Sequence, residues 1–218
     1  MEMRGKTKAV PPVDITPNSI WLRSPNALPA GRLLDGIGGH LWTVAPSLLA
    51  LLRPTASPRA RTFQTSLMDP VVAQVRLTGL LSEVAESETI VLVTHGLSGN
   101  ALSPYCAPAA SAAARAGFSS LPLSLRGPDY SGEDILHGGI TQDLWAALAA
   151  PEIARYRRVL LLGYSVGGHI VLRAAVEQTD MRVRAAAAVC PPLVLHPATA
   201  AFGHPALTPY RSQIFPGL

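Results

Sequence analysis

A serine at the centre of a glycine-rich turn is the residue best placed for covalent chemistry. The segment Gly163–Gly167 reads Gly-Tyr-Ser-Val-Gly, with Ser165 in the middle. It follows the apolar run 158–162, which favours a strand, and precedes 166–177, which favours a helix. Between a strand and a helix, the pattern G-x-S-x-G projects a serine hydroxyl above the edge of a sheet, where it can attack an electrophilic carbon. The alternative is a tight turn in which the serine is incidental.

The residues around that serine have separate expected roles. Gly163 and Gly167 lack β carbons, so the strand and the helix can approach each other closely. The N–H of Val166 lies at the amino end of the expected helix, where it would stabilise a developing oxyanion.

A second glycine-rich segment supplies a partner for this turn. Residues 95–100, His-Gly-Leu-Ser-Gly-Asn, follow a buried strand expected at 89–94. An oxyanion needs a second backbone donor from such a loop. The Leu97 N–H is the candidate, with Gly96 beside it as a loop glycine. The alternative is an ordinary glycine-rich connection.

Alternating strand and helix patterns position both segments. The chain alternates predicted strands with helical segments, which indicates a mostly parallel sheet with helices on both faces. Two short antiparallel strands precede this part, joined by a turn at 68–70. The predicted strands span 61–66, 72–79, 89–94, 119–125, 158–162 and 183–189, and the predicted helices span 104–116, 141–150 and 166–177.

Composition excludes several classes of protein. The 218 residues are 48% hydrophobic and 15% charged, which excludes a mostly disordered chain. The net charge of +4 comes from scattered basic residues, a pattern that does not favour nucleic-acid binding. No Cys/His spacing indicates a metal site, and we expect no cofactor.

We expect neither a membrane span nor a signal peptide. The apolar run 41–52, predicted as a short helix, is too short to cross a bilayer and contains Pro46. The first residues are basic but precede prolines rather than an apolar stretch. By elimination, we expect a cytoplasmic protein of undetermined oligomeric state.

The two glycine-rich motifs together resemble the α/β-hydrolase superfamily. Three further stretches narrow the resemblance to its YheT-like branch, which includes the plant embryogenesis-associated and mammalian lung hydrolases. These stretches are Gly39–Thr43 with Pro46, Leu125–Gly127 with Ser131–Glu133 and His137–Leu144, and Cys190–Pro192. The resemblance implies an α/β-hydrolase fold, a small ester or lipid-like substrate, no cofactor, and short-chain carboxylesterase or acylglycerol lipase activity with Ser165 as nucleophile.

The partners that a serine nucleophile needs are not evident in the sequence. A histidine must take its proton, and a carboxylate must orient that histidine, in the chain order Ser, acid, His. After Ser165 the only acids are Glu177 and Asp180. The resemblance places the acid and histidine after two further strands that we do not find. We therefore expect a fold lacking its last two strands, truncated within a lid region at 196–218.

The expected domains are an N-terminal extension at 1–58, a hydrolase core at 59–195 and the lid segment. His204 is a weak substitute for the missing base. Of the other histidines, we expect His137 to bind loop backbone and His169 to have a packing role, with His40 structural. The acids Asp129, Glu133, Asp134 and Asp143 precede the serine, against the usual order.

Three functions remain open at this point. The first is a serine hydrolase of carboxylic esters, incomplete in this chain. The second is an inactive fragment or pseudoenzyme that serves as an interaction module. The third is an acyltransferase or thioesterase on the same fold, since one acyl-enzyme serves all of these reactions.

Overall fold

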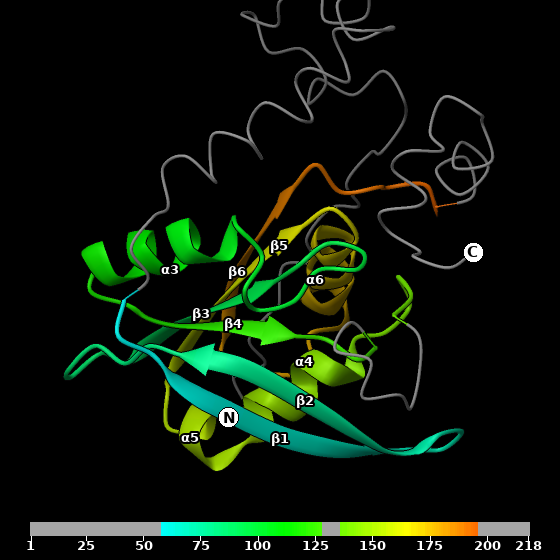
Figure 1. Cartoon of the computed structure of the whole chain (residues 1–218), viewed down its shortest axis with the longest axis horizontal. Helices are drawn as coiled ribbons and strands as arrows, with labels where there is room; N and C mark the ends of the chain where they lie inside the picture. The colour runs from blue at the N-terminus through cyan, green and yellow to red at the C-terminus, as the bar shows by residue number, and fades with distance from the viewer. Residues whose placement is uncertain (1–57, 128–135, 196–218) are drawn as a thin grey trace, which may run out of the picture. The chain divides into compact units, whose positions relative to one another are not determined.

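The computed structural model describes residues 58–127 and 136–195 (Figure 1). The predicted helix at 41–52 and lid segment at 196–218 lie outside these ranges. The described strands are β1 (Arg61–Asp69), β2 (Ala73–Leu81), β3 (Thr89–Thr94), β4 (Ser119–Ser124), β5 (Arg158–Tyr164) and β6 (Val183–Val189). The described helices are α3 (Cys106–Arg115), α4 (Gln142–Ala149), α5 (Pro151–Ala154) and α6 (Val166–Glu177).

These elements match the sequence prediction, with small differences at their ends. The first hairpin is longer than predicted, because its turn lies at 70–72 rather than 68–70. The Asp69 carboxylate accepts hydrogen bonds from the backbone N–H groups of Val71 and Val72, which fixes the turn there. The short helix α5 was not predicted; it begins at Pro151, a residue that favours the first helical position.

The six strands form one mixed sheet in the order β1-β2-β4-β3-β5-β6. β2 is antiparallel to both of its neighbours, whereas β4, β3, β5 and β6 run parallel. β3 lies inside the sheet, and its Ile90, Leu92 and Val93 side chains are fully buried, as its unbroken apolar run predicts. The prediction of a mostly parallel sheet is confirmed.

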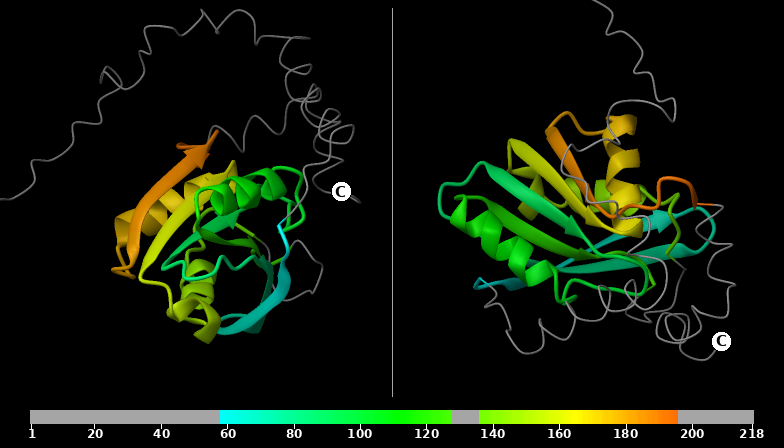
Figure 2. Two further views of the ribbon diagram at one scale, coloured as in Figure 1. Left: turned by 90° about the vertical axis from the view of Figure 1, so that its left-hand side faces the viewer. Right: turned by 90° about the horizontal axis from the view of Figure 1, so that it is seen from above.

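Helices cover both faces of the sheet. On one face α3 packs against β3 and β4, in a small cluster centred on Val93, Cys106 and Ala109. On the other face α4, α5 and α6 contribute to the main core, which includes Leu144, Ile153 and other apolar side chains. Both views in Figure 2 show α3 apart from the other helices. The loops at the carboxyl edge of the parallel strands are therefore held between two packed layers.

A buried ion pair fixes the chain after β4. The Arg126 guanidinium donates to the Asp143 carboxylate at 2.6 and 3.0 Å, and the Arg126 N–H donates to the same carboxylate at 3.0 Å. Arg126 also donates to Asp69 at 2.8 Å, and this bond lowers the pKa of Asp69. Asp143 precedes Ser165 in the chain, against the usual order of a catalytic triad. It is a structural partner of Arg126 that ties β1, the loop after β4 and α4 together.

Candidate active site

Ser165 occupies a strained turn between β5 and α6 (Figure 1). Its backbone has φ 52° and ψ −122°, a combination that residues with a side chain rarely adopt. The Ser165 N–H donates to the carbonyl of Val189 at 2.9 Å, so the end of β6 holds this conformation. The side chain is exposed at the carboxyl edge of the sheet. This is the geometry of a nucleophile elbow.

The turn depends sterically on two glycines. A β carbon on Gly163 would lie 2.3 Å from the carbonyl oxygen of Gly167, so β5 and α6 are in backbone contact there. A β carbon on Gly167 would lie 2.3 Å from the carbonyl oxygen of His95. The first turn of α6 is therefore pressed against the loop that follows β3, and no larger residue fits at either position.

Thr94 joins the two loops. Its hydroxyl is buried and donates to the carbonyl of Gly167 at 3.1 Å, on the first turn of α6. A β carbon at Gly167 would also lie 2.8 Å from this hydroxyl oxygen. Thr94 thus sets the spacing between the end of β3 and the start of α6. No motif in the sequence pointed to this role.

His95 is a buried neutral imidazole. Its Nε2 accepts a hydrogen bond from the Leu125 N–H at 3.0 Å and must therefore carry no proton. Its Nδ1 lies 2.7 Å from the carbonyl of Gly96, to which it donates. Burial lowers the pKa of His95, which favours this neutral form. Since both ring nitrogens are used, His95 shapes the loop and is not free to act as a base.

Gly96 lies directly against the serine. A β carbon on Gly96 would be 3.2 Å from Ser165 Cβ, so only glycine leaves the space beside the hydroxyl open. The candidate oxyanion donors come from this loop and from the elbow. In the described part of the chain, no acceptor takes the N–H of Leu97 or of Val166. Within those residues both N–H groups are without an acceptor, as an oxyanion donor would have to be before a ligand binds.

A family model described as the alpha/beta hydrolase fold matches residues 89–216, more than half of the chain. This protein belongs to the α/β-hydrolase family. The match covers β3, the Gly96 loop and the Ser165 elbow. No curated protein matches the sequence.

Solved structures of hydrolases have the same fold at low sequence identity. An esterase from Pyrococcus furiosus is 20% identical with a TM-score of 0.59, over 72% of this chain and 62% of the esterase. A dienelactone hydrolase from Anabaena variabilis is 22% identical with a TM-score of 0.52, over 66% and 68%. A lidless serine hydrolase from Xanthomonas campestris is 23% identical with a TM-score of 0.50, over 64% and 65%. This α/β hydrolase therefore spans less than two thirds of the length of that esterase.

The acids that follow the serine have partners elsewhere in the described part of the chain. Glu177 ends α6, at the opposite end of the helix from Ser165, and accepts from the Thr141 hydroxyl, the Trp145 indole and Arg173. Asp180 lies in the loop before β6 and is paired with Arg182. These bonds lower the pKa of both carboxylates. Neither acid is placed to orient a base at Ser165.

The described histidines also have structural partners. His137 Nδ1 accepts the N–H of Gly139 at 3.1 Å, as expected for a loop-binding histidine. His169 Nδ1 donates to the carbonyl of Pro192 at 3.0 Å, tying α6 to the segment after β6. His40, His196 and His204 lie outside the described residues, as do Asp129, Glu133 and Asp134. Within 58–127 and 136–195, no side chain hydrogen-bonds the Ser165 hydroxyl.

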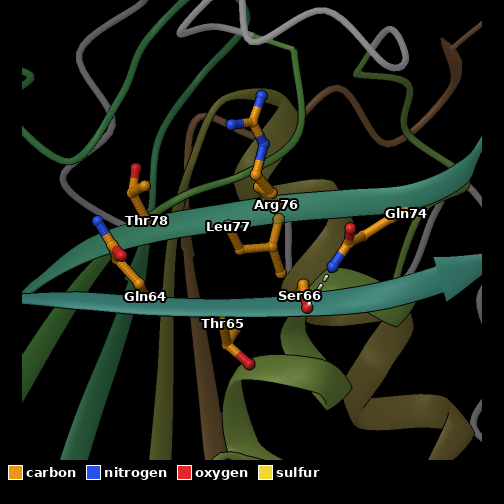
Figure 3. A pocket seen from close by; sticks show the side chains of 7 residues that line it. All are labelled: Gln64, Thr65, Ser66, Gln74, Arg76, Leu77 and Thr78. Carbon is orange, nitrogen blue, oxygen red and sulfur yellow. Dashed lines mark hydrogen bonds between the residues drawn. The ribbon is translucent and has the colours of Figure 1, made fainter.

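A hollow of about 540 Å³ lies on the β1–β2 hairpin and not at Ser165. Figure 3 shows its seven lining side chains and the hydrogen bond that Gln74 donates to Ser66. They are Gln64, Thr65, Ser66, Gln74, Arg76, Leu77 and Thr78. No histidine, cysteine or carboxylate is among them, and two strands, β4 and β3, separate the hairpin from β5. We therefore assign this hollow no catalytic role.

Within residues 58–127 and 136–195, no helix combines the length and apolar character needed to cross a bilayer. Nor does that part of the chain gather three or more His, Cys, Asp or Glu side chains as a metal site would require. The cytoplasmic location stays a prediction from the sequence.

Proposed function

We propose that this protein is a serine hydrolase of carboxylic esters, with Ser165 as its nucleophile. The observation that carries the proposal is the strained Ser165 backbone, held by Val189 and exposed against Gly96. Strain of this kind persists where the surrounding structure enforces it, and it commonly marks a functional residue. The hydrolase fold and the esterase among its structural neighbours support the same reaction class.

The arrangement accounts for the first half of ester hydrolysis. The Ser165 oxygen attacks the carbonyl carbon, and the carbonyl electron pair moves onto oxygen. The N–H groups of Leu97 and Val166 then donate to that oxyanion. When the intermediate collapses, the base passes the proton taken from Ser165 to the departing oxygen, so the alcohol leaves and the acyl group stays on Ser165, from which water releases it.

The proton acceptor for Ser165 is part of the proposal. A serine hydroxyl needs a histidine base, which a carboxylate orients. We place this pair outside the described residues, with His204 as the weak candidate within the chain. The chain spans 62% of the length of the Pyrococcus esterase. We therefore propose esterase activity for the complete catalytic unit, with this base and acid included.

The assignment to one branch of the superfamily, and to a class of substrate, rests on sequence motifs. Gly39–Thr43, His137–Leu144 and Cys190–Pro192 support the YheT-like branch, and with it a short-chain carboxylesterase or acylglycerol lipase. The substrate would then be a small ester or lipid-like molecule. An acyl acceptor other than water would make the same site a transferase, and a thioester substrate would make it a thioesterase.

Labelling with a fluorophosphonate probe tests the proposal directly. The folded protein should acquire one probe adduct, and peptide mass spectrometry should place it on Ser165. Ser165→Ala should abolish both the adduct and the hydrolysis of p-nitrophenyl butyrate. Ser98→Ala is the control, since it removes a hydroxyl from the neighbouring loop. Absence of an adduct in wild-type protein with a cooperative unfolding transition would contradict the proposal.

The second candidate is a catalytically inactive interaction module. The observation in its favour is that Glu177 and Asp180 are committed to partners away from Ser165. In that case the folded protein would neither take up the probe nor hydrolyse the ester. Turnover that disappears in Ser165→Ala would exclude this candidate.

A further inference from the structure

Tyr105 brings a hydroxyl group to the loop beside the serine. It immediately precedes α3, and its phenol oxygen accepts the Gly96 N–H at 2.9 Å. A phenol has one hydrogen to donate in addition to its acceptor sites. Among the described residues no acceptor takes the Tyr105 hydrogen. This side chain therefore offers an unused O–H donor at the candidate site.

The hydroxyl and the nucleophile border the same small space. A β carbon on Gly96 would lie 3.7 Å from the Ser165 hydroxyl oxygen and 3.6 Å from the Tyr105 hydroxyl oxygen. Glycine leaves that volume empty, so both oxygens have access to it. A carbonyl group attacked by Ser165 would lie in or beside this volume, within reach of both hydroxyls.

The structure also limits how far the phenol can move. The Tyr105 ring packs on the ring of Tyr164, with centroids 4.5 Å apart and planes tilted by 37°. Tyr164 directly precedes the nucleophile. On the other side, a β carbon on Gly99 would lie 2.9 Å from the phenol oxygen, so the loop encloses it closely. A donor held in this way loses little freedom when a negative charge develops beside it.

We propose that Tyr105 is a catalytic residue whose O–H donates to the oxyanion formed on Ser165, as a third donor besides Leu97 and Val166. The inference rests on the proposed esterase function. When the serine oxygen bonds to the carbonyl carbon, the carbonyl electron pair moves to oxygen and accepts the phenol hydrogen bond. Tyrosine keeps its proton throughout, and the electron pair returns as the alcohol leaves. The Gly96 N–H, by donating into the phenol oxygen, strengthens this donor.

Tyr105→Phe removes the hydroxyl while keeping the ring on Tyr164. Loss of one oxyanion donor typically lowers kcat by about 10²-fold. We expect a decrease of about that size in kcat for p-nitrophenyl butyrate and in the rate of fluorophosphonate labelling, with KM changed little. Tyr156→Phe is the matched control. Its hydroxyl binds Arg155, outside the site, and its labelling rate should match the wild-type rate.

Fluorotyrosine at position 105 separates donation from loop positioning. Fluorination makes a phenol a stronger hydrogen-bond donor and a weaker acceptor. If Tyr105 donates to the oxyanion, the substituted protein should label at least as fast as wild type at neutral pH. If its hydroxyl only accepts the Gly96 N–H, labelling should slow. This readout stays decisive even where Tyr105→Phe lowers stability.

The outcomes distinguish the two proposals. Wild-type protein that labels on Ser165 while Tyr105→Phe labels equally fast would overturn the role of Tyr105 and leave the esterase proposal standing. Slower labelling of the fluorotyrosine protein would do the same. A folded wild-type protein that does not label at all would overturn both.

Discussion

The two edges of the parallel strands are held together in different ways. At the carboxyl edge the polar side chains of Thr94, His95 and Arg126 are buried, and each binds fixed backbone or carboxylate groups. At the amino edge Glu88 pairs with Arg157 and Arg158, and all three side chains are about half exposed or more. The candidate site thus lies at the edge where polar groups are buried and their geometry is narrowly defined.

This difference shows where the molecule should tolerate change. Exposed ion pairs contribute little, because water and salt screen them and the side chains lose freedom on pairing. Removing the partner of a buried polar group destabilises the fold, because the group has lost its hydrogen bonds to water and gains none in return. Substitutions at the carboxyl edge should therefore be costly, whereas matched substitutions at the amino edge should not.

The largest effect is expected from Asp143→Ala. It removes the buried carboxylate that accepts three bonds from Arg126, and we expect a loss of about 3 kcal/mol in the free energy of unfolding. Urea denaturation followed by circular dichroism measures it. Asp143→Asn, which keeps acceptor oxygen but not charge, should lose less. A loss below about 1 kcal/mol for the alanine variant would contradict the importance of this pair.

Gly167→Ala tests the contact between the elbow and the Gly96 loop. The new methyl group would overlap the His95 carbonyl, so the loops must separate, at a cost of about 1–3 kcal/mol. Labelling of Ser165 should also slow, because the donors move with the loops. Gly117→Ala is the control. That glycine has φ 77° and open space around it, so the change adds backbone strain only, away from the site.

Acid should weaken the carboxyl edge through His95. Burial lowers the His95 pKa below its ordinary value of 6.5, although the nearby Asp143 charge partly opposes this. Below pH 6.5 the unfolded chain binds a proton there that the folded chain does not, so the free energy of unfolding falls as pH falls. The slope is bounded by one proton, at about 1.4 kcal/mol per pH unit. Unfolding titrations between pH 7.5 and 5 should show it for wild type.

His95→Gln provides the comparison for that profile. The amide does not titrate, so the slope between about pH 6.5 and 5 should diminish. The carboxylates with lowered pKa, Asp69, Glu177 and Asp180, lose their stabilising effect only at more acidic pH, as they protonate. If the free energy of unfolding depended on pH equally in wild type and His95→Gln, His95 would not be the group that weakens the fold in acid.

The smallest effect is expected at the amino edge. Glu88→Gln removes the exposed pairs with Arg157 and Arg158 and should change the free energy of unfolding by less than about 1 kcal/mol. Adding 0.5 M salt should shrink the difference further, because salt screens the attraction between exposed charges. A loss comparable to that of Asp143→Ala would remove the contrast between the two edges.

The fold could be predicted from the sequence because strand and helix patterns alternate with clear glycine and proline boundaries. The elbow was predicted for a similar reason, since Ser165 stands between an unmistakable strand and a helix. The pairing of Arg126 with Asp143 could not be predicted, because it depends on side-chain directions that no period encodes. The bond from Thr94 to Gly167 joins loops far apart in the chain, and Tyr105 resembles any aromatic residue before a helix.

The bond from Ser165 to Val189 has a consequence for when the proposed nucleophile acquires its backbone conformation. Its unusual backbone is completed by Val189, the last residue of β6, a strand that follows α6 in the chain. During synthesis the serine emerges well before the partner that shapes it. Reactivity at Ser165 should therefore arise late, when β6 docks on β5. A probe that labels this serine would then report the arrival of β6 at the sheet.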